Sequence, residues 1–238
     1  MQTKARNEWK GAEKMIRAII FDFDGTVADT IPAICEGVNL TMEAFGLPLH
    51  TIEEVATYIN NGPRMLITRA LPKEKQNDDA LIDRALAHYN LAYQTVCMHT
   101  DHPYDGIKEL IERLRREGYR IGVLSNKQDF LVRPMCESVL ENGFDAVLGS
   151  LPDHPAKPHP YLSQKIAAML DVEPTECIMI GDSDVDIRTA QNADMLHIGV
   201  TWGYRDAEFL RANGAANLVD TPDALYTAIK QLAKGKEE

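Results

Sequence analysis

The sequence predicts an α/β fold in which a parallel sheet is flanked by helices and interrupted by an inserted helical domain. A continuous apolar run at residues 18–21 ends at Asp22, which is typical of a strand buried on both faces. From Asp29 onward, apolar residues recur at helical spacing for about 70 residues with no strand pattern between them. After residue 99, strand and helix patterns alternate, as parallel α/β folds require.

Local signals place the helices of the inserted domain. Thr30, with Asp29 as the alternative, can cap the first helix, which ends at Gly46. Residues 51–54 (TIEE) form a capping box that opens a second helix. The pattern then predicts two further helices, at residues 64–71 and 78–97.

The alternating part of the chain supplies the rest of the sheet and its covering helices. Together with the first strand at residues 18–22, we expect strands at residues 120–124, 146–148, 177–180 and 195–200. We expect helices at residues 106–117, 129–140, 161–170, 186–192 and 222–232. The chain therefore divides into a tail at residues 1–17, an α/β core at residues 18–28 and 100–238, and a helical domain at residues 29–99.

Composition excludes several classes of partner. The formal net charge of -11 over 238 residues disfavours binding to nucleic acid and to anionic membranes. No apolar stretch approaches the roughly 18 residues of a transmembrane helix, and the polar N-terminus does not resemble a signal peptide. The four cysteines are far apart in the sequence and form no C-x-x-C pair: Cys35, Cys97, Cys136 and Cys177. We therefore expect a cytoplasmic protein with reduced, mostly buried thiols, and either a monomer or a homodimer.

Polar residues follow several of the predicted strands and one loop. The carboxyl ends of parallel strands lie on one edge of a sheet, so side chains placed there can converge although they are distant in sequence. The set comprises Asp22, Asp24, Ser125, Asn126, Lys157, Asp182 and Asp186. We expect these residues to line one crevice.

These residue types suit phosphoryl transfer. One carboxylate can attack phosphorus and form an aspartyl phosphate, while a second acid protonates the leaving oxygen and later activates water. Several carboxylates would repel a phosphate unless a divalent cation lies between them, and an all-oxygen ligand set favours Mg²⁺. A hydroxyl beside backbone amides can hold phosphate oxygens, and a lysine can stabilise the charge of the transition state.

Four motifs resemble those of the haloacid dehalogenase superfamily of phosphohydrolases. Residues 22–27 (DFDGTV) are similar to the first motif, and residues 181–186 (GDSDVD) to the fourth. Ser125, at the end of an apolar run, and Lys157 match the second and third motifs. The resemblance extends over about residues 18–220 and implies a Rossmann-like core.

The resemblance implies a role for each acidic residue. Asp22 would be the nucleophile and a metal ligand. Asp24 would be the general acid and base, with its main-chain carbonyl on the metal. Asp182 would bind the metal, and Asp186 would bind it or support the ligands.

The same resemblance assigns the phosphate-binding residues. Ser125 and the backbone amide of Asn126 would hold the phosphate oxygens, and Lys157 would neutralise them. Thr26, within the first motif, is a further candidate for phosphate binding. Trp202 and Tyr204, after the strand at residues 195–200, are expected to pack rather than to stack on a substrate.

The helical insert resembles the cap domain of the phosphoglycolate phosphatase-like branch of this superfamily. Asp29 and Thr30 resemble its hinge, and residues 61–71 resemble its substrate loop. Arg64 in that loop could bind a substrate carboxylate, because a guanidinium binds carboxylates through two hydrogen bonds. The alternative is a solvated arginine on the surface of a cap helix.

The resemblance implies a Mg²⁺-dependent phosphatase that acts on a small phosphorylated metabolite, with 2-phosphoglycolate as the leading candidate. Asp22 would carry the aspartyl-phosphate intermediate. A phosphomutase of the β-phosphoglucomutase type and a pyrophosphatase of the same branch are the alternatives within the superfamily. A non-catalytic binding module that kept the fold is the alternative outside enzyme function.

Overall fold

A parallel six-stranded sheet forms the centre of the protein. The structure, a computed structural model, describes residues 15–59, 61–100 and 102–234. The strand order is β5-β4-β1-β6-β7-β8. The strands are β1 (Ala18–Phe21), β4 (Arg120–Gln128), β5 (Ala146–Ser150), β6 (Cys177–Gly181), β7 (Leu196–Val200) and β8 (Leu218–Val219). This arrangement confirms the predicted α/β fold with a Rossmann-like core.

The alternation of side chains along β1 divides the core into two halves. Ile19 and Phe21 are fully buried in a cluster that includes apolar residues of α5 (Ile107–Arg116) and α10 (Pro222–Ala233). Ala18 and Ile20 belong to a second cluster. That cluster includes residues of α7 (Pro160–Met169) and α8 (Asp184–Asn192) on the other side of the sheet. A strand covered on both faces needs a continuous apolar sequence, which explains the run at residues 18–21.

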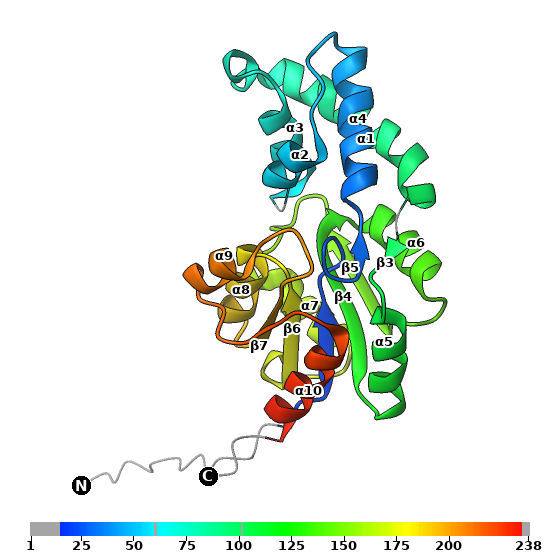
Figure 1. The fold of residues 1–238 in the computed structure, drawn as a ribbon, viewed down its shortest axis with the longest axis vertical. Helices are drawn as coiled ribbons and strands as arrows, with labels where there is room; N and C mark the ends of the chain where they lie inside the picture. The colour runs from blue at the N-terminus through cyan, green and yellow to red at the C-terminus, as the bar shows by residue number, and fades with distance from the viewer. Residues whose placement is uncertain (1–14, 60, 101, 235–238) are drawn as a thin grey trace, which may run out of the picture.

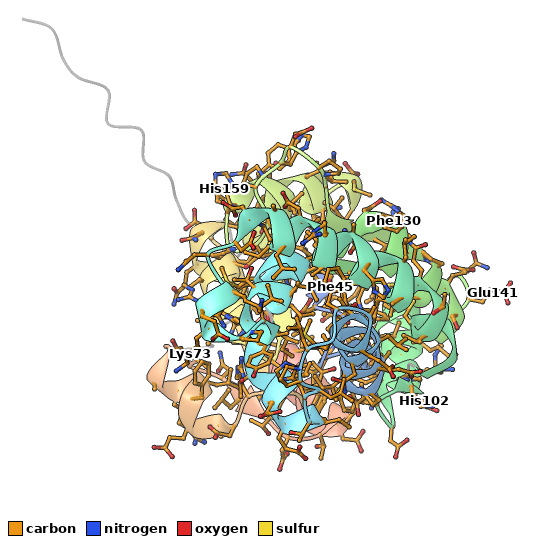
Figure 2. All side chains as sticks on the ribbon, turned by 90° about the horizontal axis from the view of Figure 1, so that it is seen from above. Phe45, Lys73, His102, Phe130, Glu141 and His159 are labelled. Carbon is orange, nitrogen blue, oxygen red and sulfur yellow. The ribbon has the colours of Figure 1, made fainter. Side chains whose placement is uncertain are left out.

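A helical lobe lies beyond the carboxyl ends of the strands (Figure 1). It consists of α1 (Ile31–Ala44), α2 (Ile52–Tyr58), α3 (Gly62–Ala70), the 3-10 turn η1 (Lys73–Lys75) and α4 (Asp79–Thr100). Seen from above, its helices lie across the end of the core that carries the loops (Figure 2). Two short antiparallel strands connect it to the core, β2 (Ala28–Asp29) and β3 (His102–Pro103).

At the start of α1, the hydroxyl of Thr30 does not cap the helix and instead contacts the core. Thr30 is the residue before the helix, but its side chain does not cap it. The Asp29 carboxylate instead accepts a hydrogen bond from the Ile31 amide at 3.3 Å. The Thr30 hydroxyl donates to Asp24 at 2.7 Å. By contrast, α2 has the predicted capping box, in which Thr51 and Glu54 exchange hydrogen bonds.

Several elements differ from the sequence prediction. β4 continues to Gln128, and its pairing with β5 shifts register between Leu124 and Gln128. The prediction missed the connecting strands β2 and β3, the short helix α9 (Ala207–Ala212) and β8. These segments have two to six residues, too few for a periodic pattern to distinguish them from loops.

The structure describes only part of the predicted tail, whereas it describes all four cysteines. Most of the tail falls on residues 1–14, which lie outside the described residues. Of its described residues, Ile16 is buried in the core and Met15 is 69% exposed. The cysteines are free and buried, as expected. No helix in the described part of the chain combines the length and apolar character that crossing a membrane requires.

The central strand sets the stability of the core. Replacing fully buried Ile19 by alanine removes packing on β1, and we expect unfolding free energy to fall by about 2–5 kcal/mol. Leu91, which is 67% exposed on α4, is the control, and Leu91→Ala should change stability by less than about 0.5 kcal/mol. Urea denaturation of both variants measures the difference, and equal losses would contradict this description of the core.

Candidate active site

Strand register brings Asp22 and Asp182 together. Phe21, the last residue of β1, pairs with Ile180 of β6, so the residues that follow both strands emerge side by side. The Asp22 amide donates to the Ile180 carbonyl oxygen at 2.8 Å. Asp22, Asp182 and Asp186 each offer a carboxylate oxygen, and these oxygens lie within 4.8 Å of one another. We call these three residues the acidic cluster.

Two glycines allow the backbone to approach the acidic cluster. Gly25 has a φ of 80° and turns the chain away from β1. A Cβ atom on Gly25 would lie 2.5 Å from an Asp182 carboxylate oxygen. A Cβ atom on Gly181 would lie 2.2 Å from the carboxyl carbon of Asp186. Both positions therefore require glycine for the carboxylates to take these places.

Asp186 is held at the start of α8. One of its oxygens accepts hydrogen bonds from the Ser183 hydroxyl at 2.6 Å and from the Ser183 amide at 3.2 Å. The other accepts a hydrogen bond from Lys157 Nζ at 2.7 Å. Both oxygens therefore have donors, which makes Asp186 the best anchored carboxylate of the three.

Lys157 lies between two carboxylates. Its side chain is 2% exposed, and Nζ lies 2.9 Å from Asp22 Oδ1 and 2.7 Å from Asp186 Oδ1. Asn126 fixes the main chain of Lys157: its amide oxygen accepts from Lys157 N at 2.8 Å, and its amide nitrogen donates to Lys157 O at 3.0 Å. The Asn126 side chain therefore orients the main chain of Lys157, a contact that the sequence did not predict.

The electrostatics of the acidic cluster call for a further cation. Burial raises the pKa of Asp22 to about 7, an effect that Lys157 opposes and that Asp186 and Asp24 reinforce. Burial, with Asp186 and Asp22 nearby, also raises the pKa of Asp182 well above its usual range. Burial works to lower the pKa of Lys157, but Asp186 and Asp22 outweigh it and the pKa lies above its usual range. Three carboxylates thus share one ammonium group.

The donor set fits a hard divalent cation. Oδ1 of Asp182 is buried and has no hydrogen-bond donor among the described residues. Oδ1 of Asp22 is buried too, and its contact with Lys157 is an ion pair without hydrogen-bond geometry. Both oxygens belong to carboxylates, which are the ligands that Mg²⁺ and Ca²⁺ prefer. The acidic cluster could therefore hold such an ion.

Asp24 is not part of the acidic cluster and has other partners. Its Oδ1 accepts a hydrogen bond from the Thr30 hydroxyl at 2.7 Å and lies 2.7 Å from Lys127 Nζ. Lys127 also donates to the hydroxyl of Tyr93 on α4. The sequence pattern did not indicate Lys127 as a site residue. Its place directly after Ser125 and Asn126, at the end of β4, is the signal that could have found it.

The loop after β7 connects the acidic cluster to the lobe. The Tyr204 amide donates to Asp182 at 2.7 Å, and its hydroxyl accepts a hydrogen bond from the Thr30 amide at 2.9 Å. The Trp202 indole donates to the Thr26 carbonyl oxygen at 3.1 Å. Arg205 donates to the Ala56 carbonyl oxygen of α2 at 3.1 Å. Trp202 and Tyr204 pack against the core as expected, and Tyr204 also orients an acidic residue.

A cavity of about 80 Å³ lies between the core and the lobe. The core lines it with Asp22, Asp24, Ser125, Asn126, Lys127, Gln128, Leu131, Lys157, Ser183 and Val185. The lobe lines it with Ile34, Ile59, Gly62, Pro63, Leu66, Tyr89 and Tyr93. Five of the residues predicted to line one crevice therefore line this cavity: Asp22, Asp24, Ser125, Asn126 and Lys157. Asp182 and Asp186, predicted with them, are not among its lining residues and lie beside Asp22 in the acidic cluster.

Thr26 and Arg64 are not among the described residues that line the cavity. Thr26 is fully buried in the turn after β1. The Arg64 guanidinium binds Asp79 at 2.8 Å and also binds Asp83, both on α4. The position of Arg64 agrees with the alternative interpretation, a solvated arginine on the surface of the lobe.

Comparison with known proteins agrees with the fold. The sequence matches the family described as haloacid dehalogenase-like hydrolase over residues 19–200. A phosphoglycolate phosphatase of Aliivibrio fischeri is 32% identical over 198 residues, which cover 81% of this chain and 87% of the relative. One of Colwellia psychrerythraea is 28% identical over 218 residues, which cover 90% and 96%.

Solved structures also agree with the fold. The crystal structure of a protein from Lactobacillus delbrueckii subsp. bulgaricus matches with a TM-score of 0.84 at 31% identity, and the match covers 90% of this chain and 98% of that one. CbbY from Rhodobacter sphaeroides shares the fold, with a TM-score of 0.71 at 24% identity over 87% and 95% of the two chains.

Together, the parallel sheet and its carboxylates at the strand ends define an α/β hydrolytic enzyme. The chain belongs to the haloacid dehalogenase-like hydrolase family. The predicted superfamily and enzyme class are confirmed. The roles of the individual residues stay predictions.

The raised pKa values predict how pH affects stability. Between about pH 4 and pH 7, Asp22 in the metal-free folded protein holds a proton that the unfolded chain has released, because burial raises the pKa of Asp22 to about 7. The contribution of Asp22 to stability should therefore fall as pH rises through this window. A divalent cation binds the ionised carboxylates, so Mg²⁺ should stabilise the protein more at pH 8 than at pH 5.

Thermal unfolding with Mg²⁺ or with EDTA measures this effect. At 100-fold excess over its Kd, Mg²⁺ should raise the melting temperature by about 5–10 °C at pH 8 and by clearly less at pH 5. A sodium salt of matched ionic strength is the control. An equal shift at both pH values, or none at either, would contradict the proposed ion site.

Proposed function

We propose that this protein is a Mg²⁺-dependent phosphatase for a small phosphorylated metabolite, with 2-phosphoglycolate as the leading substrate. The observation that carries the proposal is the meeting of Asp22, Asp182 and Lys157 at the carboxyl edge of the sheet. The substrate rests on the names of the relatives, several of which are phosphoglycolate phosphatases. The lobe at residues 29–99 would act as a cap over a core formed by residues 18–28 and 100–238.

The acidic cluster would hold the metal. Carboxylate oxygens of Asp22 and Asp182 that accept no hydrogen bond would be ligands, and the main-chain carbonyl of Asp24 would be a third. Asp186, with both oxygens engaged, would mainly orient Lys157. When bound, Mg²⁺ would neutralise the carboxylates and the phosphate so that the two can approach.

In the first step, an Asp22 carboxylate oxygen would attack phosphorus and form a P–O bond as the ester P–O bond breaks. The electron pair of the broken bond stays on the leaving oxygen, which takes a proton from the carboxyl group of Asp24. Ser125, the Asn126 amide and Lys157 would hold the phosphate oxygens. The free alcohol then leaves the cavity.

In the second step, the Asp24 carboxylate would accept a proton from a water molecule whose oxygen attacks phosphorus. The bond between phosphorus and Asp22 breaks, which regenerates the Asp22 carboxylate and releases inorganic phosphate. The lobe supports this sequence because its apolar residues limit the space above the acids.

Replacing the nucleophile tests the proposal. Asp22→Asn removes the attacking charge at almost constant volume, and we expect phosphatase activity to fall by at least about 10³-fold. Activity is measured as inorganic phosphate released from 2-phosphoglycolate with Mg²⁺ and with EDTA. The matched control is Asp223→Asn, an exposed residue at the start of α10, which should retain wild-type activity. Activity that persists in a folded Asp22→Asn variant would refute the assigned nucleophile.

A further inference from the structure

Lys127 is a second buried lysine in the cavity, and the reaction described above does not use it. It lies at the end of β4, and its side chain is 6% exposed. Its Nζ lies 2.7 Å from Asp24 Oδ1 and donates to the hydroxyl of Tyr93. Nζ also lies 4.6 Å from the centre of the Tyr93 ring. A buried ammonium in these contacts has a defined position in the site.

The cavity contains few positive groups to meet an anionic substrate. Among the described residues that line it, the cationic ones are Lys127 and Lys157. Lys157 lies between Asp22 and Asp186, where the phosphate would bind. The described residues that the lobe contributes are apolar, glycine or tyrosine, and Arg64 is bound to Asp79 and Asp83 outside the cavity. Any negative charge on the leaving group would therefore be met by Lys127.

The location of Lys127 also determines where a negative charge on the leaving group must lie to contact it. Asp24 would contact the leaving oxygen, and Lys127 lies one ion-pair distance beyond Asp24. A carboxylate on the carbon next to the leaving oxygen would place its own oxygens about one hydrogen-bond length from that oxygen. In 2-phosphoglycolate the carboxylate is attached to that carbon. A more distant anion would have to extend toward the apolar residues of the lobe.

We propose that Lys127 is the specificity-determining residue that selects phosphate esters whose leaving group carries a carboxylate on the carbon next to the leaving oxygen. This inference rests on the proposed phosphatase function. When Asp24 turns to the leaving oxygen, the substrate carboxylate takes its place beside Lys127. A neutral leaving group would not form the charge-assisted hydrogen bond with this buried ammonium that a carboxylate forms, so it would bind less tightly. Tyr93 is a positioning residue that keeps Lys127 directed at this place.

A matched pair of substrates tests the inference. 2-Phosphoglycolate and 2-hydroxyethyl phosphate differ in having a carboxylate or a hydroxymethyl group at the same carbon. The ratio of their kcat/KM values cancels any loss that affects both reactions, such as a misplaced Asp24. In the wild-type protein this ratio should be at least about 10, because a charge-assisted hydrogen bond contributes about 10- to 100-fold.

The variants isolate the charge of Lys127. In Lys127→Met the ratio should fall toward one, mainly through a higher KM for 2-phosphoglycolate, whereas Lys127→Arg should restore most of it. Arg64→Met tests the cap arginine, and we expect it to leave the ratio unchanged. Lys75→Met, an exposed lysine of η1, is the control for the loss of one positive charge.

Three outcomes decide between the proposals. An unchanged ratio in folded Lys127→Met, or a lower ratio in Arg64→Met, would overturn the role of Lys127. If Lys127→Met does not fold, a wild-type ratio near one overturns it just as directly. If the wild-type protein hydrolyses neither ester, nor p-nitrophenyl phosphate, with Mg²⁺, the phosphatase function itself is refuted.

Discussion

The site depends on one electrostatic constraint: three buried carboxylates lie together, and among the described residues one ammonium group forms ion pairs with two of them. Asp22, Asp182 and Asp186 lie within reach of one ion, and Lys157 contacts two of them. Such a group is unstable without more positive charge, because ionised carboxylates lose their hydration on burial. The raised pKa values of Asp22 and Asp182 reflect this unfavourable burial of charge. A bound divalent cation would offset the repulsion between the carboxylates, which links the stability of the fold to the proposed chemistry.

The fold holds the carboxylates in place from several directions. The pairing of β1 with β6 places Asp22 beside Asp182, and the packed core on both faces of the sheet fixes that register. The loop after β7 reaches Asp182 through the Tyr204 amide, Thr30 through the Tyr204 hydroxyl, and α2 through Arg205. The loop after β7 therefore links the acidic cluster to the lobe through hydrogen bonds, so a movement of the lobe would shift this loop and its hydrogen bond to Asp182.

The sequence predicted the sheet, its helices and most of the convergent residues, because apolar periodicity and glycine turns report local structure. It did not predict that Lys127 lies in the site, since an isolated lysine usually indicates a solvated surface. The contacts of Lys127 come from Asp24 and Tyr93, which are distant in sequence. The resemblance of residues 61–71 to a substrate loop suggested a substrate contact for Arg64, with a solvated arginine as the alternative. The aspartates of α4 that bind it become neighbours only in the folded lobe.

Direct titration with Mg²⁺ tests the central claim, that the acidic cluster is a site for one divalent ion. Isothermal titration calorimetry at pH 8 should give one Mg²⁺ per chain. Asp182→Asn, which keeps the shape of the side chain but removes its charge, should weaken binding by at least about tenfold. If the folded Asp182→Asn variant binds Mg²⁺ as tightly as the wild-type protein, the ion lies elsewhere and this account of the site is wrong.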